Sequence, residues 1–506
     1  MAHGFALRSK QLGSRLLRPR SWLRGLGLII AGALLPLGFA PFNWWWLAVI
    51  SLALSWPLAS SRKPWLSGWC FGLGVYGCGV SWIFVSLYRY TEVGAFGAMG
   101  ATLSLAMALA LFFALPFGLM QRLPKAWQTS MVFSLFWVGG EWLRSWLFTG
   151  FPWLYAGYAT LHIPGLAGWI PVVGIFGASY LFVWLAQHLF TLCQHIRKRQ
   201  WSWTPVLLLA GILGTGLVLE RQQWQVNDQT RTLEVGIVQG NIDQADKWRA
   251  AAAPGIEKMH LELTEQLLAM DAELIIWPEA ALPYLYSESQ DFLQQLNSAL
   301  LAAPSQSALL TGVLSDNQLG PRIDPIQVQS TPWQDPEQRS KIAVRNSVVL
   351  MDPRQTSHQI YHKQRLVPFG EYLPFAKQLI PLLPFLESFR YGITQGAAQQ
   401  VPMTYRNWHL QPLVCYEIAF PGLIYNQLQQ PVDFLVALSN DGWFNGSHGP
   451  SQHFQMARFR AKAFGVPVIR ATNSGITGII DHTGAVAARI PAQRAGILRE
   501  GISTVT

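Results

Sequence analysis

The stretch Leu274-Ile275-Ile276-Trp277-Pro278-Glu279 indicates a buried β-strand that stops abruptly. Four apolar residues in succession are typical of a strand covered on both faces, and a proline cannot donate to the strand ladder. The strand therefore presents the carboxylate of Glu279 at its C-terminal end. Open α/β folds bind their ligands at that edge of the sheet.

The sequence around this strand, from about residue 231 onward, alternates β-branched runs with amphipathic stretches. This alternation predicts a layered α/β domain over residues 231–506. The expected strands span residues 233–238, 274–277, 308–313, 344–350, 410–415 and 434–438, with a last strand at 501–506. The expected helices span residues 255–270, 288–302 and 449–464.

The composition of the whole chain differs from that of an ordinary soluble protein. Hydrophobic residues make up 51% and charged residues only 13%, about half the usual charged share. The net charge of +10 would suit a nucleic-acid partner. However, residues 1–220 hold 15 Lys/Arg and 3 Asp/Glu, whereas residues 221–506 hold 22 and 24. The positive excess lies in the apolar half, so no nucleic-acid partner is expected.

Residues 1–220 are predicted to form a membrane domain of about seven transmembrane helices, each needing about 20 apolar residues. The candidate spans are residues 25–40, 44–59, 65–88, 94–120, 129–147, 166–193 and 203–219. The first two are short, so they form either a tight hairpin or one re-entrant pair. Thirteen of the 15 basic residues fall on one predicted face, which places the N-terminus in the cytoplasm. Seven crossings then place the α/β domain on the far side, which in a bacterium is the periplasm.

Four residues inside the predicted spans stand out. Glu141 and Arg144 are three residues apart, either as a satisfied internal pair or as part of a lipid or substrate path. Gly68 and Gly72 form a GxxxG pattern, which predicts a helix-packing face.

Two further segments of the α/β domain end in polar side chains, at Lys363 and at Cys415. A thiol attacks as the thiolate, and its ordinary pKa of about 8.5 means that it needs a nearby base or cation. Glu279 is the candidate base, and Lys363 the candidate for stabilising an oxyanion. Each residue alone has a structural explanation, but all three end or follow a strand in one domain. Together they favour catalysis.

Other kinds of site find little support in the sequence. The HExxH, GxxxxGK[ST] and GxSxG patterns are absent from it. The 4 cysteines have no regular spacing, so neither a disulfide scaffold nor a zinc site is indicated. His448 and His453, near a predicted helix start, suit a capping or core role better than metal binding. We therefore expect no metal and no cofactor.

The motifs around Glu279, Lys363 and Cys415 resemble those of the nitrilase superfamily, in order and spaced 84 and 52 residues apart. That resemblance implies a four-layer α-β-β-α sandwich with a catalytic Glu–Lys–Cys set. With about seven spans ahead of this domain, nearly the whole chain resembles the bacterial apolipoprotein N-acyltransferases. The supporting segments are Thr149-Gly150-Phe151-Pro152-Trp153, Gln239-Gly240-Asn241, Pro368-Phe369-Gly370-Glu371-Tyr372 and Ser439-Asn440-Asp441-Gly442-Trp443-Phe444.

The resemblance implies a two-step acyl transfer at the bacterial inner membrane, without a cofactor. Cys415 would attack the sn-1 ester of a phospholipid, expected to be phosphatidylethanolamine. Glu279 would accept the thiol proton and Lys363 would stabilise the oxyanion. The thioester would then pass its acyl chain to the N-terminal amine of the diacylglyceryl-cysteine of an apolipoprotein.

The resemblance also implies supporting roles for five residues. Glu371 would orient the catalytic lysine or relay a proton, and Tyr416 and Glu417 would shape the pocket. Trp248 would contact substrate from a mobile loop, its alternative being an ordinary interfacial tryptophan. Asn346 would support the oxyanion region.

Three questions stay open at the level of the sequence. A membrane-tethered nitrilase-type amidase is one alternative, and a transporter or scaffold with an inactive nitrilase-like domain is another. Residues 373–390 are too apolar for a solvated loop, so they either cover the core or dip into the membrane surface. The resemblance also implies a further spanning helix after the catalytic domain, and no apolar run of that length follows residue 500.

Overall fold

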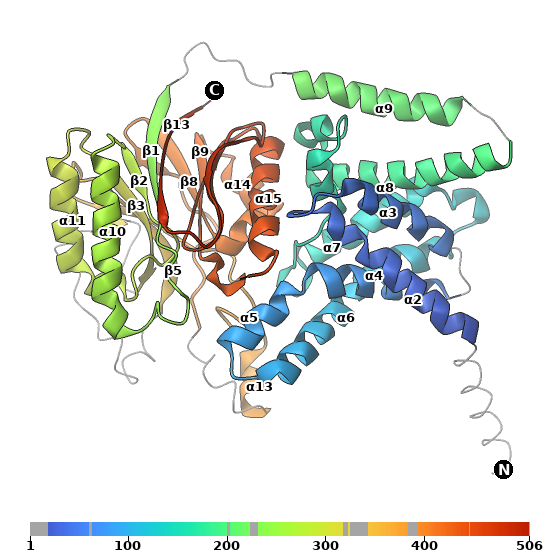
Figure 1. Cartoon of the computed structure of the whole chain (residues 1–506), viewed down its shortest axis with the longest axis horizontal. Coiled ribbons are helices and arrows are strands. Elements are labelled where there is room, and N and C mark those ends of the chain that lie inside the picture. The colour runs from blue at the N-terminus through green and yellow to red at the C-terminus, as the bar shows by residue number, and fades with distance from the viewer. Residues whose placement is uncertain are drawn as a thin grey trace. The chain divides into compact units, whose positions relative to one another are not determined.

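A computed structural model describes residues 19–59, 63–199, 203–222, 231–316, 322–323, 343–382, 392–444 and 446–504. The chain divides into two compact units, Met1–Gln222 and Gln223–Thr506. Among its described residues the first unit contains helices and the segments that connect them, and the second unit contains both sheets (Figure 1).

The first unit contains a helix within each of the seven predicted spans. Its α-helices are α2 (Pro19–Ala33), α3 (Trp45–Ala59), α4 (Pro64–Gly79), α5 (Trp82–Tyr90), α6 (Gly94–Met120), α7 (Ser130–Arg144), α8 (Ile170–Arg197) and α9 (Thr204–Arg221). Among the described residues, three helical stretches are long and apolar enough to cross a membrane: Gly94–Met120, Ala167–Arg197 and Thr204–Arg221. Helices α4 and α5 form a further apolar pair bent by 54°.

These helices are compatible with a multi-pass membrane protein. The apolar helices Trp22–Gly38 and Trp45–Pro57 are shorter than a full span. The side chain of Ser51 donates to the carbonyl of Ala31 at 2.6 Å, which joins α2 to α3. The number of crossings therefore stays a prediction, as does the domain boundary near residue 220.

The predicted GxxxG packing face lies on α4, where it meets α6. A Cβ added at Gly72 would lie 2.8 Å from the Cα of Ala110, and one at Gly68 would lie 2.9 Å from the Cα of Ala114. Glycine is therefore required at both positions for the two helix backbones to approach. The prediction of a helix-packing face is confirmed.

The second unit is built on two β-sheets. The seven-stranded sheet has the order β13-β1-β2-β3-β5-β6-β4 and the six-stranded sheet has the order β12-β11-β10-β9-β8-β7. The strands of the first sheet are β1 (Thr232–Gln239), β2 (Leu274–Ile276), β3 (Ala308–Ser315), β4 (Arg322–Ile323), β5 (Arg345–Met351), β6 (His358–His362) and β13 (Gly496–Ser503). The strands of the second sheet are β7 (Met403–Tyr405), β8 (Trp408–Val414), β9 (Phe434–Ser439), β10 (Val468–Thr472), β11 (Thr477–Ile480) and β12 (Val486–Ile490).

The two sheets pack face to face because alternate residues of their strands are apolar. Leu274 and Ile276 of β2 lie in one core with Leu410 and Val414 of β8, whereas Ile275 points to the opposite face. That outer face is covered by α10 (Ala253–Leu268) and α11 (Gln290–Ala302). The outer face of the second sheet is covered by α14 (Pro421–Gln427) and α15 (Gly449–Phe464) (Figure 1). The unit is therefore the predicted four-layer α-β-β-α sandwich.

The predicted strands and helices of this unit match observed elements to within about two residues at most ends. The last strand differs, since β13 begins at Gly496 instead of residue 501. Within the apolar segment 373–390, residues Ala376–Leu382 form helix α13. Residues 383–390 lie outside the described residues, so both accounts of that segment remain open.

Candidate functional site

Three of the predicted site residues lie at one edge of the first sheet. Strands β2 and β3 are parallel, and β5 is antiparallel to both β3 and β6. Strands β2 and β6 therefore end at the same edge, where Glu279 and Lys363 follow them. Asn346, at the start of β5, lies there too, because its carbonyl accepts from the backbone N–H of Lys363 at 2.8 Å.

The side chains at this edge form one buried cluster. The ammonium of Lys363 lies 2.8 Å from Oε1 of Glu371 and 3.4 Å from Oε1 of Glu279. The amide of Asn346 donates to the same two oxygens, at 2.7 Å to Glu279 and 3.1 Å to Glu371. Lys363 is 1% exposed, so the two carboxylates, themselves bound by the Asn346 amide, fix the position of its ammonium.

Two carboxylates around one lysine keep that lysine charged. Burial by itself would lower the pKa of Lys363, but the charges of Glu371 and Glu279 outweigh burial and raise this pKa well above its ordinary value. Lys363 is therefore a permanent cation at the site. Such a cation can stabilise an oxyanion that develops beside it.

The remaining carboxylate oxygens of the cluster accept backbone N–H groups. Oε2 of Glu279 accepts from the N–H of Asn440 at 2.8 Å, and Oε2 of Glu371 accepts from the N–H of Val367 at 2.8 Å. Strand β3 leaves room for the backbone of Glu279 only because residue 312 is glycine. A Cβ at Gly312 would lie 2.6 Å from the Cα of Glu279.

Cys415 follows strand β8 of the second sheet and has an unusual backbone conformation. Its φ is +52°, in the left-handed region that side-chain-bearing residues enter at an energetic cost. Burial raises the pKa of the Cys415 thiol, the negative charge of Glu279 raises it further, and Lys363 opposes both. Glu279 and Lys363 thus act electrostatically on this thiol, which is protonated in the resting site.

Glu417 joins the Cys415 turn to the segment after Lys363. Its carboxylate accepts from the N–H groups of Val414 at 2.7 Å and of Gln364 at 2.6 Å. Burial raises the pKa of Glu417 to about 7, although these backbone donors oppose the shift. Glu417 therefore determines how the nucleophile and lysine segments lie relative to each other. The ring of Tyr416 packs edge-on against Phe420, with centroids 4.9 Å apart.

Trp248 lies on the loop between β1 and α10, and its side chain is 45% exposed. The preceding residue, Lys247, is buried and donates to the backbone carbonyl of Glu279 at 3.1 Å. Burial lowers the pKa of Lys247 to about 8, against the opposing charge of Glu279. The loop that carries Trp248 is thereby joined to the Glu279 turn.

The structure brings Glu279, Lys363, Glu371 and Asn346 into direct contact, with the Cys415 thiol under the influence of their charges. Sequence reasoning missed the contributions of Asn440 and Lys247. Asn440 acts through a backbone N–H, which has no sequence signature, although it follows an apolar strand as Glu279 does. Lys247 adjoins Trp248, but a single lysine in a loop gives no sign of burial.

The two histidines near the start of α15 have different places. His448 occupies the N-cap position of α15, whereas His453 is buried, 1% exposed. The predicted core role is confirmed for His453, whereas the side chain of His448 makes no capping hydrogen bond to the helix. Among the described residues, no group of three or more His, Cys, Asp or Glu side chains is arranged to hold a metal ion.

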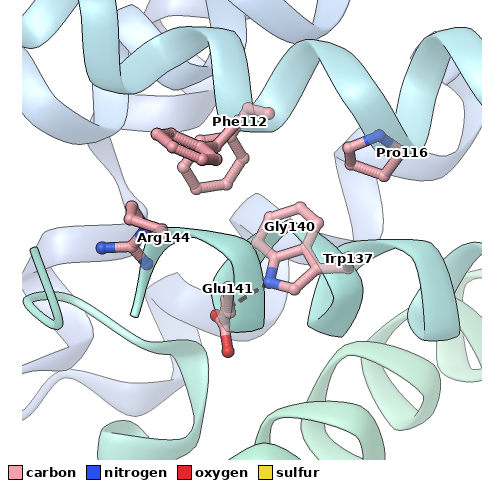
Figure 2. A pocket seen from close by; sticks show the side chains of 7 residues that line it. Phe112, Pro116, Trp137, Gly140, Glu141 and Arg144 are labelled. Atoms are coloured by element: carbon pink, nitrogen blue, oxygen red, sulfur yellow. Dashed lines mark hydrogen bonds between the residues drawn. The ribbon is translucent and has the colours of Figure 1, made fainter. Parts of the chain in front are cut away.

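The polar pair of the first unit holds a segment of its own backbone in place. Glu141 accepts from the indole of Trp137 at 3.0 Å and from the N–H of Ala156 at 2.9 Å. Arg144 donates to the carbonyl of Phe151 at 3.0 Å. Figure 2 shows both side chains beside a small pocket. The pocket is lined by Phe112, Phe113, Pro116, Trp137, Gly140, Glu141 and Arg144.

The sandwich, with Glu279, Lys363 and Cys415 at the ends of its strands, defines a carbon-nitrogen hydrolase domain of the nitrilase type. The family model described as Carbon-nitrogen hydrolase matches residues 234–505. A carbon-nitrogen hydrolase of Helicobacter pylori is 14% identical in sequence, with a TM-score of 0.38 over 53% of this chain and 88% of that chain.

The comparisons narrow this class further. Residues 31–188 match the model described as Apolipoprotein N-acyltransferase N-terminal domain. The Apolipoprotein N-acyltransferase of Azotobacter vinelandii is 35% identical over 484 residues, 94% of this chain and 89% of that protein. The one of Vibrio cholerae is 32% identical over 502 residues, 98% of this chain and 92% of that protein. The chain belongs to the apolipoprotein N-acyltransferase family, and the resemblance found in the sequence is confirmed.

Proposed function

We propose that this protein transfers an acyl chain from a phospholipid to the N-terminal amine of the diacylglyceryl-cysteine of apolipoproteins. The observation that carries the proposal is the cluster of Glu279, Lys363 and Glu371, of which Glu279 and Lys363 act electrostatically on the Cys415 thiol. The relatives' name, Apolipoprotein N-acyltransferase, supports the acceptor. The expected donor is phosphatidylethanolamine, through its sn-1 ester.

In the first half-reaction, the sulfur of Cys415 attacks the ester carbonyl while Glu279 accepts the thiol proton. The carbonyl oxygen becomes an oxyanion, which the ammonium of Lys363 stabilises. The C–O bond to the glycerol then breaks. The departing alkoxide takes the proton from Glu279 and leaves as a lysophospholipid, so a thioester remains on Cys415.

In the second half-reaction, the amine of the apolipoprotein attacks the thioester carbonyl. Glu279 takes a proton from the attacking nitrogen, and Lys363 again stabilises the oxyanion. The C–S bond breaks, an amide forms, and the proton on Glu279 returns to the sulfur of Cys415. The enzyme is thereby restored without a cofactor.

The proposal also assigns a place to each part of the chain. Residues 1–220 form a multi-pass domain in the bacterial inner membrane with the N-terminus in the cytoplasm, and residues 231–506 form the periplasmic catalytic domain. The distribution of basic residues supports this orientation, since 13 of the 15 before residue 220 fall on one predicted face.

Trapping of the thioester tests this function. The purified protein in detergent is incubated with phosphatidylethanolamine labelled in its sn-1 chain, without acceptor, and the Cys415 peptide is examined by mass spectrometry. We expect a hydroxylamine-sensitive acyl group on Cys415 that a diacylglyceryl-cysteine peptide removes. The Cys415→Ala variant should acquire none, whereas Cys193→Ala, which changes a cysteine of the first unit, should behave as wild type. Hydrolysis of a small amide without acylation of Cys415 would show that the protein is an amidase instead.

A further inference from the structure

A second buried polar cluster contacts Cys415 within the catalytic unit. It consists of Asp441, which follows β9, His453 on α15 and Arg470 on β10, each no more than 1% exposed. Nη2 of Arg470 donates to Oδ2 of Asp441 at 2.8 Å, and Nδ1 of His453 lies 3.0 Å from Oδ1 of Asp441. Gly475 allows this packing, since a Cβ there would lie 2.7 Å from the Cβ of Asp441.

This cluster contacts both the backbone and the side chain of Cys415. Nε2 of His453 lies 3.1 Å from the carbonyl oxygen of Cys415. The hydroxyl of Ser439 donates to Oδ1 of Asp441 at 2.6 Å and is hydrogen-bonded to the Cys415 thiol. Cys415 has the strained φ of +52°, and such a conformation persists only where its surroundings hold it.

The charges around His453 determine which of its nitrogens carries hydrogen. Burial lowers the pKa of His453, and the charge of Arg470 lowers it further, so the imidazole is neutral. The carbonyl oxygen of Cys415 can only accept, so its 3.1 Å contact with Nε2 requires the hydrogen on that nitrogen. Nη2 of Arg470, 3.0 Å from Nδ1, donates to the bare nitrogen and offsets its 3.0 Å contact with Oδ1 of Asp441. His453 therefore donates to the Cys415 carbonyl.

The carboxylate of Asp441 stays charged beside these groups. Burial would raise the pKa of Asp441, but the charge of Arg470 opposes burial and this pKa lies far below its ordinary value. Asp441 is therefore too weak a base to take the thiol proton. A positioning role remains for it.

We propose that Asp441, His453 and Arg470 are positioning residues for the acyl transfer, which hold Cys415 in its left-handed conformation beside Glu279 and Lys363. The inference rests on the proposed function in that Cys415 is the nucleophile. Arg470 orients His453, His453 fixes the Cys415 carbonyl, and Asp441 fixes the Cys415 thiol through Ser439. The charged groups that act on the Cys415 thiol are Glu279, Lys363 and Asp441. The neutral His453 contacts the Cys415 backbone carbonyl.

Two substitutions of His453 separate positioning from simple packing. Glutamine places an amide N–H where Nε2 stands, whereas asparagine reaches only the position of Nδ1. We expect His453→Gln to retain most of the kcat of acyl transfer. We expect His453→Asn to lower kcat about tenfold with KM nearly unchanged, the rate equivalent of one lost hydrogen bond. The matched control is His409→Gln. His409 lies on strand β8, which leads to Cys415, and pairs with Asp433 at 3.2 Å.

A second measurement does not depend on acyl transfer. The rate at which iodoacetamide alkylates Cys415 is measured against pH by peptide mass spectrometry, in the wild type, Asp441→Asn and His409→Gln. Because the negative charge of Asp441 raises the thiol pKa, Asp441→Asn should move the alkylation profile to lower pH. Asp441→Asn should also lower the kcat of acyl transfer, because the thiol is less well positioned even though more of it is ionised.

Failure of this inference and failure of the proposed function would give different results. An unchanged alkylation profile in Asp441→Asn, or equal kcat values for His453→Gln and His453→Asn, would overturn the inference. A wild-type protein that never forms an acyl group on Cys415 would instead refute the proposed function. Thermal unfolding of each variant in detergent identifies any variant that fails to fold, and the remaining variant then decides the question.

Discussion

Asn346 provides the sharpest test of the catalytic cluster, because its single amide group contacts both carboxylates. The amide nitrogen lies 2.7 Å from Oε1 of Glu279 and 3.1 Å from Oε1 of Glu371. A hydrogen bond to a charged group is worth about 1.5–3 kcal/mol. Loss of both in Asn346→Ala therefore costs about 3 kcal/mol at the lower end, which corresponds to a fall of roughly 100-fold in kcat/KM.

The Asn346→Asp variant adds a predicted direction of pH dependence. A third carboxylate about 3 Å from two others would be repelled by about 5 kcal/mol from each at an effective dielectric constant of about 20. The new carboxyl group therefore stays protonated at neutral pH and donates one hydrogen bond in place of two. We expect a kcat/KM between those of Asn346→Ala and the wild type at pH 7. Its activity should fall as rising pH removes that proton, with no parallel fall in the wild type.

The assay follows transfer of a labelled acyl chain from phosphatidylethanolamine to a diacylglyceryl-cysteine peptide in detergent, between pH 6 and 9. Asn426→Asp, which adds the same charge at an exposed position of α14, serves as the control and should leave kcat/KM within about twofold of wild type. A kcat/KM for Asn346→Ala within threefold of wild type would refute the reasoning. So would an Asn346→Asp profile parallel to that of the wild type.

Three further predictions concern the surroundings of the cluster. Gly312→Ala should abolish most acyl transfer and also lower thermal stability by about 1–3 kcal/mol, because a Cβ there lies 2.6 Å from the Cα of Glu279; wild-type kcat would contradict this. Because burial raises the pKa of Glu417 to about 7 from 4.5, its protonated form stabilises the fold below pH 4.5, and that stability is lost as pH rises through 7. The wild type should therefore lose about 3 kcal/mol relative to Glu417→Gln between pH 4.5 and 8 in denaturant unfolding, and a constant difference would exclude this. Alkylation of Cys415 by iodoacetamide should be slow at pH 7 and rise above pH 9, since its thiol pKa is raised; in Lys363→Met the profile should move to still higher pH, and a shift to lower pH would contradict the assigned charge.

The sandwich fold was predictable because its central strands are apolar and end in recognisable residues. Strands β2 and β9 are buried along their whole length and β8 is buried except at His409, so their composition is conspicuous. Strand β10 is equally buried but contains Arg470, which interrupts the apolar pattern. Strand β6 reads His-Gln-Ile-Tyr-His and carries no apolar run either. Both are held by partners from distant parts of the chain, which sequence periodicity does not report.

The candidate site was predictable in part for the same reason. Glu279 and Cys415 each follow an apolar strand, so the sequence places them near a sheet edge, whereas β6, the strand before Lys363, carries no apolar run. The contribution of Asn440 could not be predicted, because it is a backbone N–H whose direction depends on the turn after β9. The role of His453 was equally hidden, since its partners Asp441 and Arg470 lie 12 and 17 residues away in the sequence.

The charge of the cluster explains how the proposed reaction can be both fast and selective. Two carboxylates, Glu279 and Glu371, share the one ammonium of Lys363, so the resting cluster carries a net negative charge beside Cys415. Burial and the negative charge of Glu279 raise the pKa of the Cys415 thiol and keep it protonated, and a protonated thiol is a poor nucleophile towards adventitious electrophiles. When Glu279 takes the proton during attack, one of the two negative charges disappears, and Lys363 is released to face the new oxyanion. Lys363 therefore stabilises negative charge most strongly once an ester carbonyl is under attack. An interaction that is stronger in the transition state than in the resting site lowers the barrier to reaction.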